Sequence, residues 1–219
     1  MSLIFEDFLE MEKSVQGFNN IMGNDYFSKE LTSLYKSLTL EELDELLEAS
    51  IINDRVEILD AICDLIFTGF IWLNTTGVEV KELYQKIRFS ELRQLHGGGK
   101  LKKLVGAFEQ DRPDLFVRYL IEMMILKQVH YDFKGAFQEV LRSNMSKFSE
   151  KGIDIQKEIS IIEEDGRYGG VFIEEVSHDG KIYVMFKAMK DLSKGVDFDK
   201  PKLIKSSSYS EPVLEEFVL

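Results

Sequence analysis

Six acidic side chains fall in two short stretches with helical spacing, and this spacing constrains the fold more than any other feature of the sequence. The six residues are Glu41, Glu42, Glu45, Glu57, Asp60 and Asp64. Side chains three or four positions apart share one face of a helix, so each stretch predicts an acidic ridge beside apolar positions. Neighbouring carboxylates resist ionisation, and burying them unpaired is costly. The pattern therefore predicts a bound cation, and Mg²⁺ suits such oxygen ligands.

Length and charge narrow the class of protein. A chain of 219 residues with 44% hydrophobic residues fits one domain, or one domain with a large insertion. Its formal net charge of −12 argues against a nucleic-acid polymer or an anionic membrane as the main partner. The longest apolar stretch, residues 65–73, is far short of the ~20 residues that cross a bilayer. The first residues lack the basic segment of a signal peptide, and we expect a cytoplasmic protein.

Apolar periodicity predicts helices in the first two thirds of the chain. We expect one or two amphipathic helices in residues 3–22, a helix in 28–52, and a strongly apolar helix in 54–73 with Asp54 as its N-cap. Thr39 and Glu42 also have the spacing of a capping box, which is an alternative role for Glu42. Further helices are predicted between residues 75 and 129 and in 132–145.

The pattern changes after Gly152, where apolar and polar residues alternate. Residues 171–173 and 182–186 are typical of two strands joined as a hairpin. Residues 200–217 read as an extended tail or loop. The sequence thus predicts a helical protein with a small β extension near its C-terminal end.

Four motifs in a fixed order resemble those of a known superfamily. They are EE-x-x-E at 41–45, DAICD at 60–64, EVLRSNMSK at 139–147 and KLIKSSSYSEP at 202–212. Together they resemble the all-α nucleoside triphosphate pyrophosphohydrolases, the MazG-like group that includes dimeric dUTPases and phosphoribosyl-ATP pyrophosphohydrolases. The resemblance implies an all-α helical bundle, formed here by residues 1–74 and 130–150, with a helical insertion at 75–129. Residues 151–219 are then a C-terminal extension with a β-hairpin and a nucleotide-contacting tail.

The resemblance also implies roles for the acidic residues. Glu42 and Glu45 correspond to metal ligands of the first motif, and Glu41 is an additional acid that deprotonates or orients water. The second motif has two registers. Glu57 and Asp60 fit E-x-x-D literally, whereas the apolar run after Asp64 matches the apolar residues that come after the family's aspartate. In that second register the family's glutamate falls on an alanine, Ala61, and Asp60 takes its place.

The last two motifs imply the substrate contacts. Arg142, Asn144 and Lys147 resemble residues of a late helix that faces the nucleotide, and Lys205 and Tyr209 resemble a tail that carries a lysine and then an aromatic residue. Guanidinium, ammonium and amide groups are the donors that phosphates and base edges accept. The alternative for the first three residues is an ordinary helix C-terminus, where cations complement the helix dipole.

The sequence therefore predicts a pyrophosphohydrolase that uses Mg²⁺, with Mn²⁺ as an alternative, and splits a (d)NTP such as dUTP or dCTP into monophosphate and pyrophosphate. By resemblance the partner is the nucleotide, and the assembly is a homodimer or homotetramer. A phosphoribosyl-ATP pyrophosphohydrolase-like activity is the second choice. Two further interpretations stay open: a non-catalytic nucleotide-binding or protein-interaction module, which Ala61 favours, and a helical bundle whose acids form a solvated face.

Overall fold

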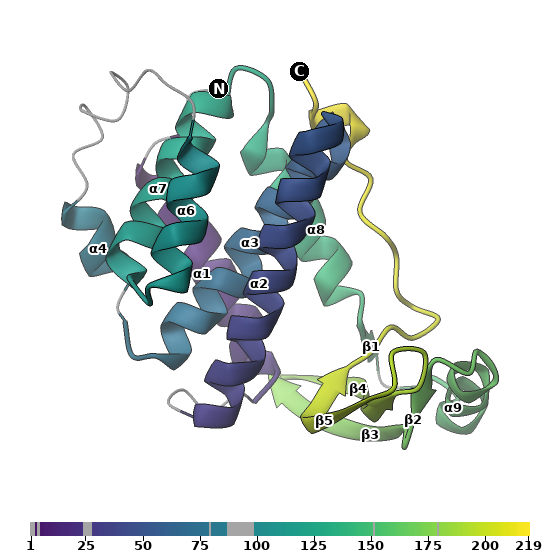
Figure 1. Ribbon diagram of the computed structural model, residues 1–219. Coiled ribbons are helices and arrows are strands. Elements are labelled where there is room, and N and C mark those ends of the chain that lie inside the picture. Colours follow the sequence, from purple (N-terminus) through teal and green to yellow (C-terminus); the bar gives the residue numbers. More distant parts are fainter. Residues whose placement is uncertain are drawn as a thin grey trace. The chain divides into compact units, whose positions relative to one another are not determined.

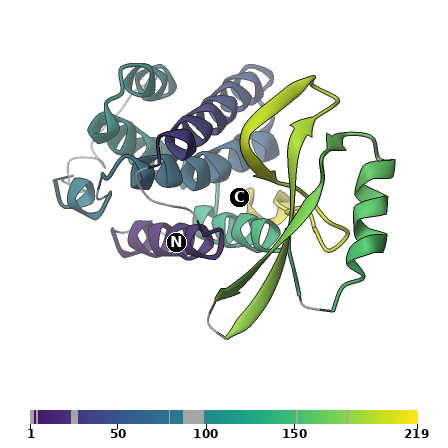
Figure 2. The ribbon, with the colours of Figure 1, turned by 90° about the horizontal axis from the view of Figure 1, so that it is seen from below.

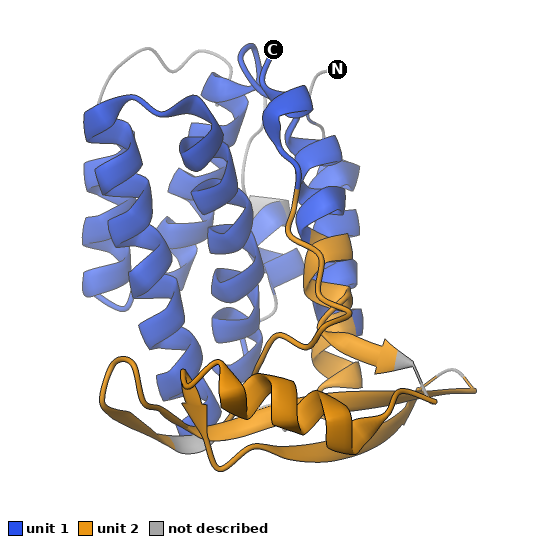
Figure 3. Cartoon of the chain, turned by 90° about the vertical axis from the view of Figure 1, so that its right-hand side faces the viewer, with its two compact units in different colours: residues 1–17, 25–140, 213–219 blue, residues 18–24, 141–212 orange. Residues whose placement is uncertain are grey.

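Helices dominate the chain, and one antiparallel sheet follows them (Figure 1). The computed structural model describes residues 3, 5–23, 28–78, 80–86, 99–150, 152–178 and 180–219. The chain divides into two compact units (Figure 3). Unit 1 comprises residues 1–17, 25–140 and 213–219, and unit 2 comprises residues 18–24 and 141–212. The predicted division into a hydrolase core and an insertion stays a prediction.

Unit 1 is built from helices, two of which, α1 and α8, also extend into unit 2. The helices are α1 (Phe5–Ile21), α2 (Lys29–Ile52), α3 (Arg55–Thr75), α4 (Val80–Lys86), α6 (Lys100–Glu109), α7 (Pro113–Lys127) and α8 (Phe133–Met145). The helical content predicted for the first two thirds of the chain is confirmed for the described residues. Of the predicted insertion, residues 79 and 87–98 lie outside the described residues.

A tight turn makes α2 and α3 a helical hairpin. Asn53 adopts the left-handed conformation, with φ at 57°, and ends α2. Asp54 then caps α3, as predicted, by accepting hydrogen bonds from the backbone N–H groups of Val56 and Glu57 at 3.1 and 3.2 Å. This turn sets the two acidic stretches of the sequence on neighbouring antiparallel helices (Figure 1).

The capping box predicted for Thr39 and Glu42 is wrong. The helix begins much earlier, where the Ser28 hydroxyl accepts a hydrogen bond from the backbone of Leu31. Thr39 lies buried in the middle of α2, and its hydroxyl donates to the carbonyl oxygen of Tyr35 at 2.7 Å. Apolar residues on both sides of Thr39 continue the helix through this point, so Glu42 has no role in a helix N-terminus.

The core of unit 1 forms around α3, most of which is buried. Trp72 stacks edge-on against Phe108 of α6 and Phe116 of α7, with ring centroids 5.0 and 5.5 Å apart. A Cβ atom at Gly69 would lie 3.0 Å from the Phe116 ring, so this glycine allows the close packing of α7 on α3. The core therefore fixes α3 along its length, including the turns that carry the acids.

Unit 2 contains a five-stranded antiparallel sheet centred on β4. Its strands are β1 (Phe148–Glu150), β2 (Tyr168–Gly169), β3 (Phe172–His178), β4 (Lys181–Asp191) and β5 (Val196–Leu203). The predicted hairpin is confirmed, since Ile173 of β3 pairs with Phe186 of β4. The sheet is nevertheless larger than the predicted hairpin, because the other three strands also pair with β4.

A helix that the sequence analysis did not predict, α9 (Ile155–Glu164), lies against one face of this sheet (Figure 2). Ile162 of α9 packs with Val184 and Phe186 of β4 in a small apolar core that also includes Ile204. The core continues into the residues that follow β5, and it holds the start of the segment 204–212 against the sheet. None of the helices in the described part of the chain is long and apolar enough to cross a membrane.

Candidate functional site

Five of the predicted acidic residues form one electrostatic group on α2 and α3, which we call the acidic cluster. Its members are Glu41, Glu42, Glu45, Asp60 and Asp64. Burial raises the pKa of Glu42 from 4.5 to about 9, and the charges of the four other carboxylates, Asp64 first, act in the same direction. A carboxyl group with such a pKa holds a proton at neutral pH.

One carboxyl oxygen of Glu42 lacks a hydrogen-bond donor among the described residues. Its Oε2 atom is buried and accepts no hydrogen bond from any described residue. A buried carboxylate oxygen without a donor is costly, and the surrounding charges add repulsion. The group therefore favours either a proton or a cation at this position.

Besides burial, the carboxylates of α3 also raise the pKa of a neighbouring core residue, Cys63. The Cys63 thiol is fully buried, and burial, then Asp64 and Asp60, hold its pKa well above the usual value. A buried thiol with a raised pKa is unreactive and serves as core packing. The carboxylates of α3 are thus close to the apolar interior, where water screens charge poorly.

The remaining acid of the second motif, Glu57, lies in the first turn of α3 and is exposed. Its charge is not among those that raise the pKa of Glu42. A carboxylate in the first turn complements the helix dipole. The structure thus brings Asp60 and Asp64 to Glu42 and leaves Glu57 at the helix terminus, which favours the Asp60/Asp64 register.

The acidic side chains do not yet converge on one point. Within the described ranges, no three His, Cys, Asp or Glu side chains are arranged to hold a metal ion. The residues have the oxygen donors that Mg²⁺ prefers, and Glu42 supplies a buried oxygen without a hydrogen bond. The donor chemistry therefore fits Mg²⁺.

The five predicted substrate contacts lie together in unit 2, in what we call the tail cluster: Arg142, Asn144, Lys147, Lys205 and Tyr209. Arg142 at the end of α8 donates to the Ser210 hydroxyl at 2.8 Å and to the carbonyl oxygen of Glu211 at 3.0 Å. Lys147 donates to the side-chain oxygen of the buried Asn144 at 2.5 Å. Residues far apart in the sequence thus meet where the segment 204–212 passes α8.

An aromatic ring is the centre of the tail cluster. The ammonium groups of Lys205 and Lys147 lie 4.1 and 5.9 Å from the centroid of the Tyr209 ring, within the range of cation–π attraction. The Tyr209 hydroxyl accepts a hydrogen bond from Ser143, and Glu211 forms an ion pair with Lys205 at 3.0 Å. Three cationic side chains thus lie beside one aromatic ring, a combination that suits an anionic ligand.

One buried acid beside the tail cluster has no signal in the local sequence. Glu158 of α9 is only 3% exposed, and its carboxylate accepts hydrogen bonds from Ser207. Another missed acid, Glu122 of α7, is buried in an ion pair with Lys100 and Arg118. Glu158 lies in the first turn of α9, where its sequence position predicts only an exposed complement to the helix dipole. Its partner is 49 residues away in sequence, and no local pattern gives that contact.

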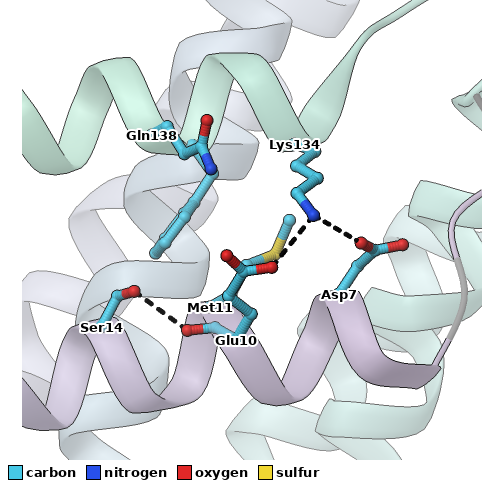
Figure 4. Close-up of a pocket in the computed structure, with 7 residues that line it drawn as sticks. Asp7, Glu10, Met11, Ser14, Lys134 and Gln138 are labelled. Atoms are coloured by element: carbon cyan, nitrogen blue, oxygen red, sulfur yellow. Dashed lines mark hydrogen bonds and ion pairs between the residues drawn. The ribbon is translucent and has the colours of Figure 1, made fainter.

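A small hollow of about 230 Å³ lies between α1 and α8 in unit 1 (Figure 4). The Lys134 ammonium group points into it and contacts Asp7 and Glu10 at 3.1 and 3.0 Å. None of the predicted site residues lines this hollow. Two carboxylates already neutralise its lysine, so the hollow lacks the charge that would attract a phosphate.

Comparison with known protein families identifies part of the chain. Residues 10–91, which are 82 of the 219 residues, match the family model described as phosphoribosyl-ATP pyrophosphohydrolase. The matched segment includes both acidic motifs and ends before α8. Comparisons with curated proteins and with solved structures found no match. The resemblance predicted from the motifs is thereby confirmed for this segment.

Proposed function

We propose that the protein is a Mg²⁺-dependent pyrophosphohydrolase, because residues 10–91 match the family model described as phosphoribosyl-ATP pyrophosphohydrolase. Its substrate contains a nucleoside triphosphate, which it splits between the α and β phosphates. One observation carries the proposal. Within the matched segment, the half-buried carboxyl group of Glu42 is surrounded by four other carboxylates, and its buried Oε2 atom accepts no hydrogen bond from any described residue.

We assign the metal to Glu42, Glu45, Asp60 and Asp64. Carboxylates that repel one another gain most from a divalent cation, which removes the repulsion and provides a partner for the Glu42 oxygen. Binding then requires Glu42 to lose its proton and the side chains to rotate toward the ion. When bound, Mg²⁺ supplies positive charge for phosphate oxygens and acidifies water. Mn²⁺, with the same preference for oxygen ligands, is expected to substitute.

Glu41 is the group that we assign to proton transfer. It is an exposed member of the acidic cluster on α2, where it takes a proton from the attacking water. The water oxygen bonds to the α-phosphorus as the bond to the bridging oxygen breaks. Pyrophosphate leaves with the electron pair of that bond, and the other product is the monophosphate.

The tail cluster supplies the substrate contacts in this proposal. Arg142, Lys147 and Lys205 bind phosphate oxygens, Asn144 pairs with a base edge or sugar, and Tyr209 offers a ring for stacking. The matched family favours phosphoribosyl-ATP as the first substrate to test. The motifs of α8 and the tail, which lie outside the match, favour dUTP or dCTP. We also propose a homodimer or homotetramer, which size-exclusion chromatography with light scattering tests.

A non-catalytic nucleotide-binding protein is the second candidate. It is favoured by the acidic side chains of the described residues, which do not converge as a metal site, and by the alanine at position 61. This candidate keeps nucleotide binding at the tail cluster and lacks turnover. The two candidates therefore differ in product formation.

The deciding experiment incubates the purified protein with Mg²⁺ and, separately, with phosphoribosyl-ATP, dUTP, dCTP and ATP. Products are identified by anion-exchange chromatography. We expect pyrophosphate and the corresponding monophosphate from at least one substrate, and no product with EDTA. Glu45→Gln should lose this activity, whereas Glu48→Gln, the same change at an exposed position of α2, should keep it. Absence of pyrophosphate from every substrate would rule out the proposed function.

A further inference from the structure

The segment 204–212 is attached to unit 2 through its serines. Ser206 and Ser208 donate to or accept from the Ser149 hydroxyl of β1 at 3.1 and 2.9 Å, and they contact each other at 2.7 Å. Ser149 and Ser206 are buried. Hydroxyl groups in such a network are stiffer than a solvated loop, because each one limits the rotation of its neighbours.

Contacts to the end of α8 extend the network. The Ser208 hydroxyl donates to the carbonyl oxygen of Ser146 at 3.1 Å, and the backbone N–H of Ser210 donates to the Ser146 hydroxyl at 2.9 Å. The segment is thus bound on both sides of Tyr209. These contacts replace hydrogen bonds that the irregular backbone of the segment would otherwise form with water. The segment is therefore more ordered than a solvated loop.

A carboxylate, that of Glu158, binds the centre of the segment. One carboxylate oxygen accepts from the backbone N–H of Ser207, and the other accepts from the Ser207 hydroxyl at 2.7 Å. Hydrogen bonds to a carboxylate are roughly twice as strong as those between neutral groups, and burial strengthens them further. The backbone of Ser207 is therefore fixed in position and direction.

Two residues of the segment, Lys205 and Tyr209, belong to the tail cluster. Lys205 and Tyr209 lie two positions before and two positions after Ser207. Their side chains meet outside the serine network, with the ammonium group 4.1 Å from the ring centroid. Fixing Ser207 therefore fixes the distance and orientation between the two side chains.

We propose that Glu158 is a positioning residue, which holds the 204–212 segment so that Lys205 and Tyr209 are in place before the nucleotide binds. This inference rests on the proposed function, because it assigns the tail cluster to the substrate. Its cause is entropic: a segment that is already ordered loses less freedom when it binds. Loss of Glu158 should therefore weaken substrate binding and leave the chemical step unchanged.

The test compares steady-state kinetics of Glu158→Gln and Glu163→Gln on the best substrate of the panel. Glu163 is on the same helix and exposed, so it controls for a changed charge on α9. We expect Glu158→Gln to raise KM about tenfold and to leave kcat within about twofold. Ser207→Ala, which removes only the hydroxyl contact, should raise KM by about threefold. Glu163→Gln should match the wild type.

A double-mutant cycle separates positioning from a general effect on folding. In a background that carries Lys205→Met and Tyr209→Leu, the side chains to be positioned are gone, so adding Glu158→Gln should change kcat/KM by less than about twofold. An unchanged KM in Glu158→Gln and Ser207→Ala would overturn the inference, as would a full tenfold loss in the double-substituted background. Circular dichroism confirms that each variant is folded, and Ser207→Ala remains decisive if Glu158→Gln is not. A wild type without turnover on any substrate would instead refute the proposed function, and the inference with it.

Discussion

The acidic cluster differs from the serine network in how its acidic groups are satisfied. The serine network comprises the hydrogen bonds that join Ser146, Ser149, Ser206, Ser207, Ser208, Ser210 and Glu158. In the acidic cluster, Glu42 has a buried oxygen without a hydrogen bond and four carboxylates around it. In the serine network, both oxygens of the buried Glu158 accept hydrogen bonds from one residue. Each site holds an acid with buried oxygen atoms, and among the described residues only Glu158 has hydrogen-bond donors for both of its oxygens.

The difference indicates where the binding partner of each carboxyl group comes from. A buried charge needs a partner of opposite sign or several donors. Glu158 has those donors, which is the arrangement of a structural support. Glu42 lacks them at its Oε2 atom, which is the arrangement of a site completed from outside by a proton or a metal ion. Substitutions in the acidic cluster and in the serine network test this comparison.

The largest expected effect is on turnover. Asp64→Asn removes a carboxylate that we assign to the metal and should lower kcat/KM by at least about a hundredfold. Glu57→Gln, at the exposed start of α3, should change it by less than about threefold. Steady-state kinetics of the two variants thus decide the register of the second motif. Loss of activity in Glu57→Gln with retention in Asp64→Asn would reverse the assignment.

The second effect is a dependence of stability on pH that comes from Glu42. Between pH 4.5 and about 9 only the folded chain keeps the proton of this group, so the free energy of unfolding should fall as pH rises, on the order of 1 kcal/mol per pH unit. The Glu42→Gln variant has no such proton and should give a flatter profile. Urea unfolding from pH 5 to pH 8 in EDTA measures both. Parallel profiles for the two proteins would show that Glu42 is ionised when folded.

The smallest effect concerns the serine network. Ser149→Ala removes the hydroxyl that joins Ser206 and Ser208, and it should lower the free energy of unfolding by about 1 kcal/mol. Ser160→Ala on the exposed side of α9 is the matched control and should change it by less than about 0.5 kcal/mol. Urea unfolding of the three proteins gives the comparison. Equal stability of all three would mean that water replaces the network without loss.

Periodicity and capping predicted the helices that precede the sheet because those signals are local, although they missed α9. Asp54 caps α3 as predicted, and the apolar run of α3 is buried. The role of Glu57 was also readable, since it lies three residues after the N-cap, at the end where helices favour acids. The capping box at Thr39 failed because a cap motif has meaning only at a helix end, and the helix continues on both sides.

The sheet was harder to predict because its strands are held by distant partners. β1 and β2 contain three and two residues, too few for an alternating pattern. β5 includes Pro201, which argues against a central strand and is tolerated at an edge. The contact between Glu158 and Ser207 likewise joins residues 49 positions apart. The acidic cluster was foreseen because two adjacent helices bring it together.

The packing around Trp72 also gives the protein an optical label. The sequence contains one tryptophan, and it lies in the aromatic core of α3, α6 and α7, so its fluorescence reports only on unit 1. Circular dichroism in the far ultraviolet records both units. Following the two signals through one denaturation curve would show whether the units melt together or in succession. The same emission, recorded at equilibrium, would reveal whether an ion bound by α2 and α3 tightens the core two turns away along α3.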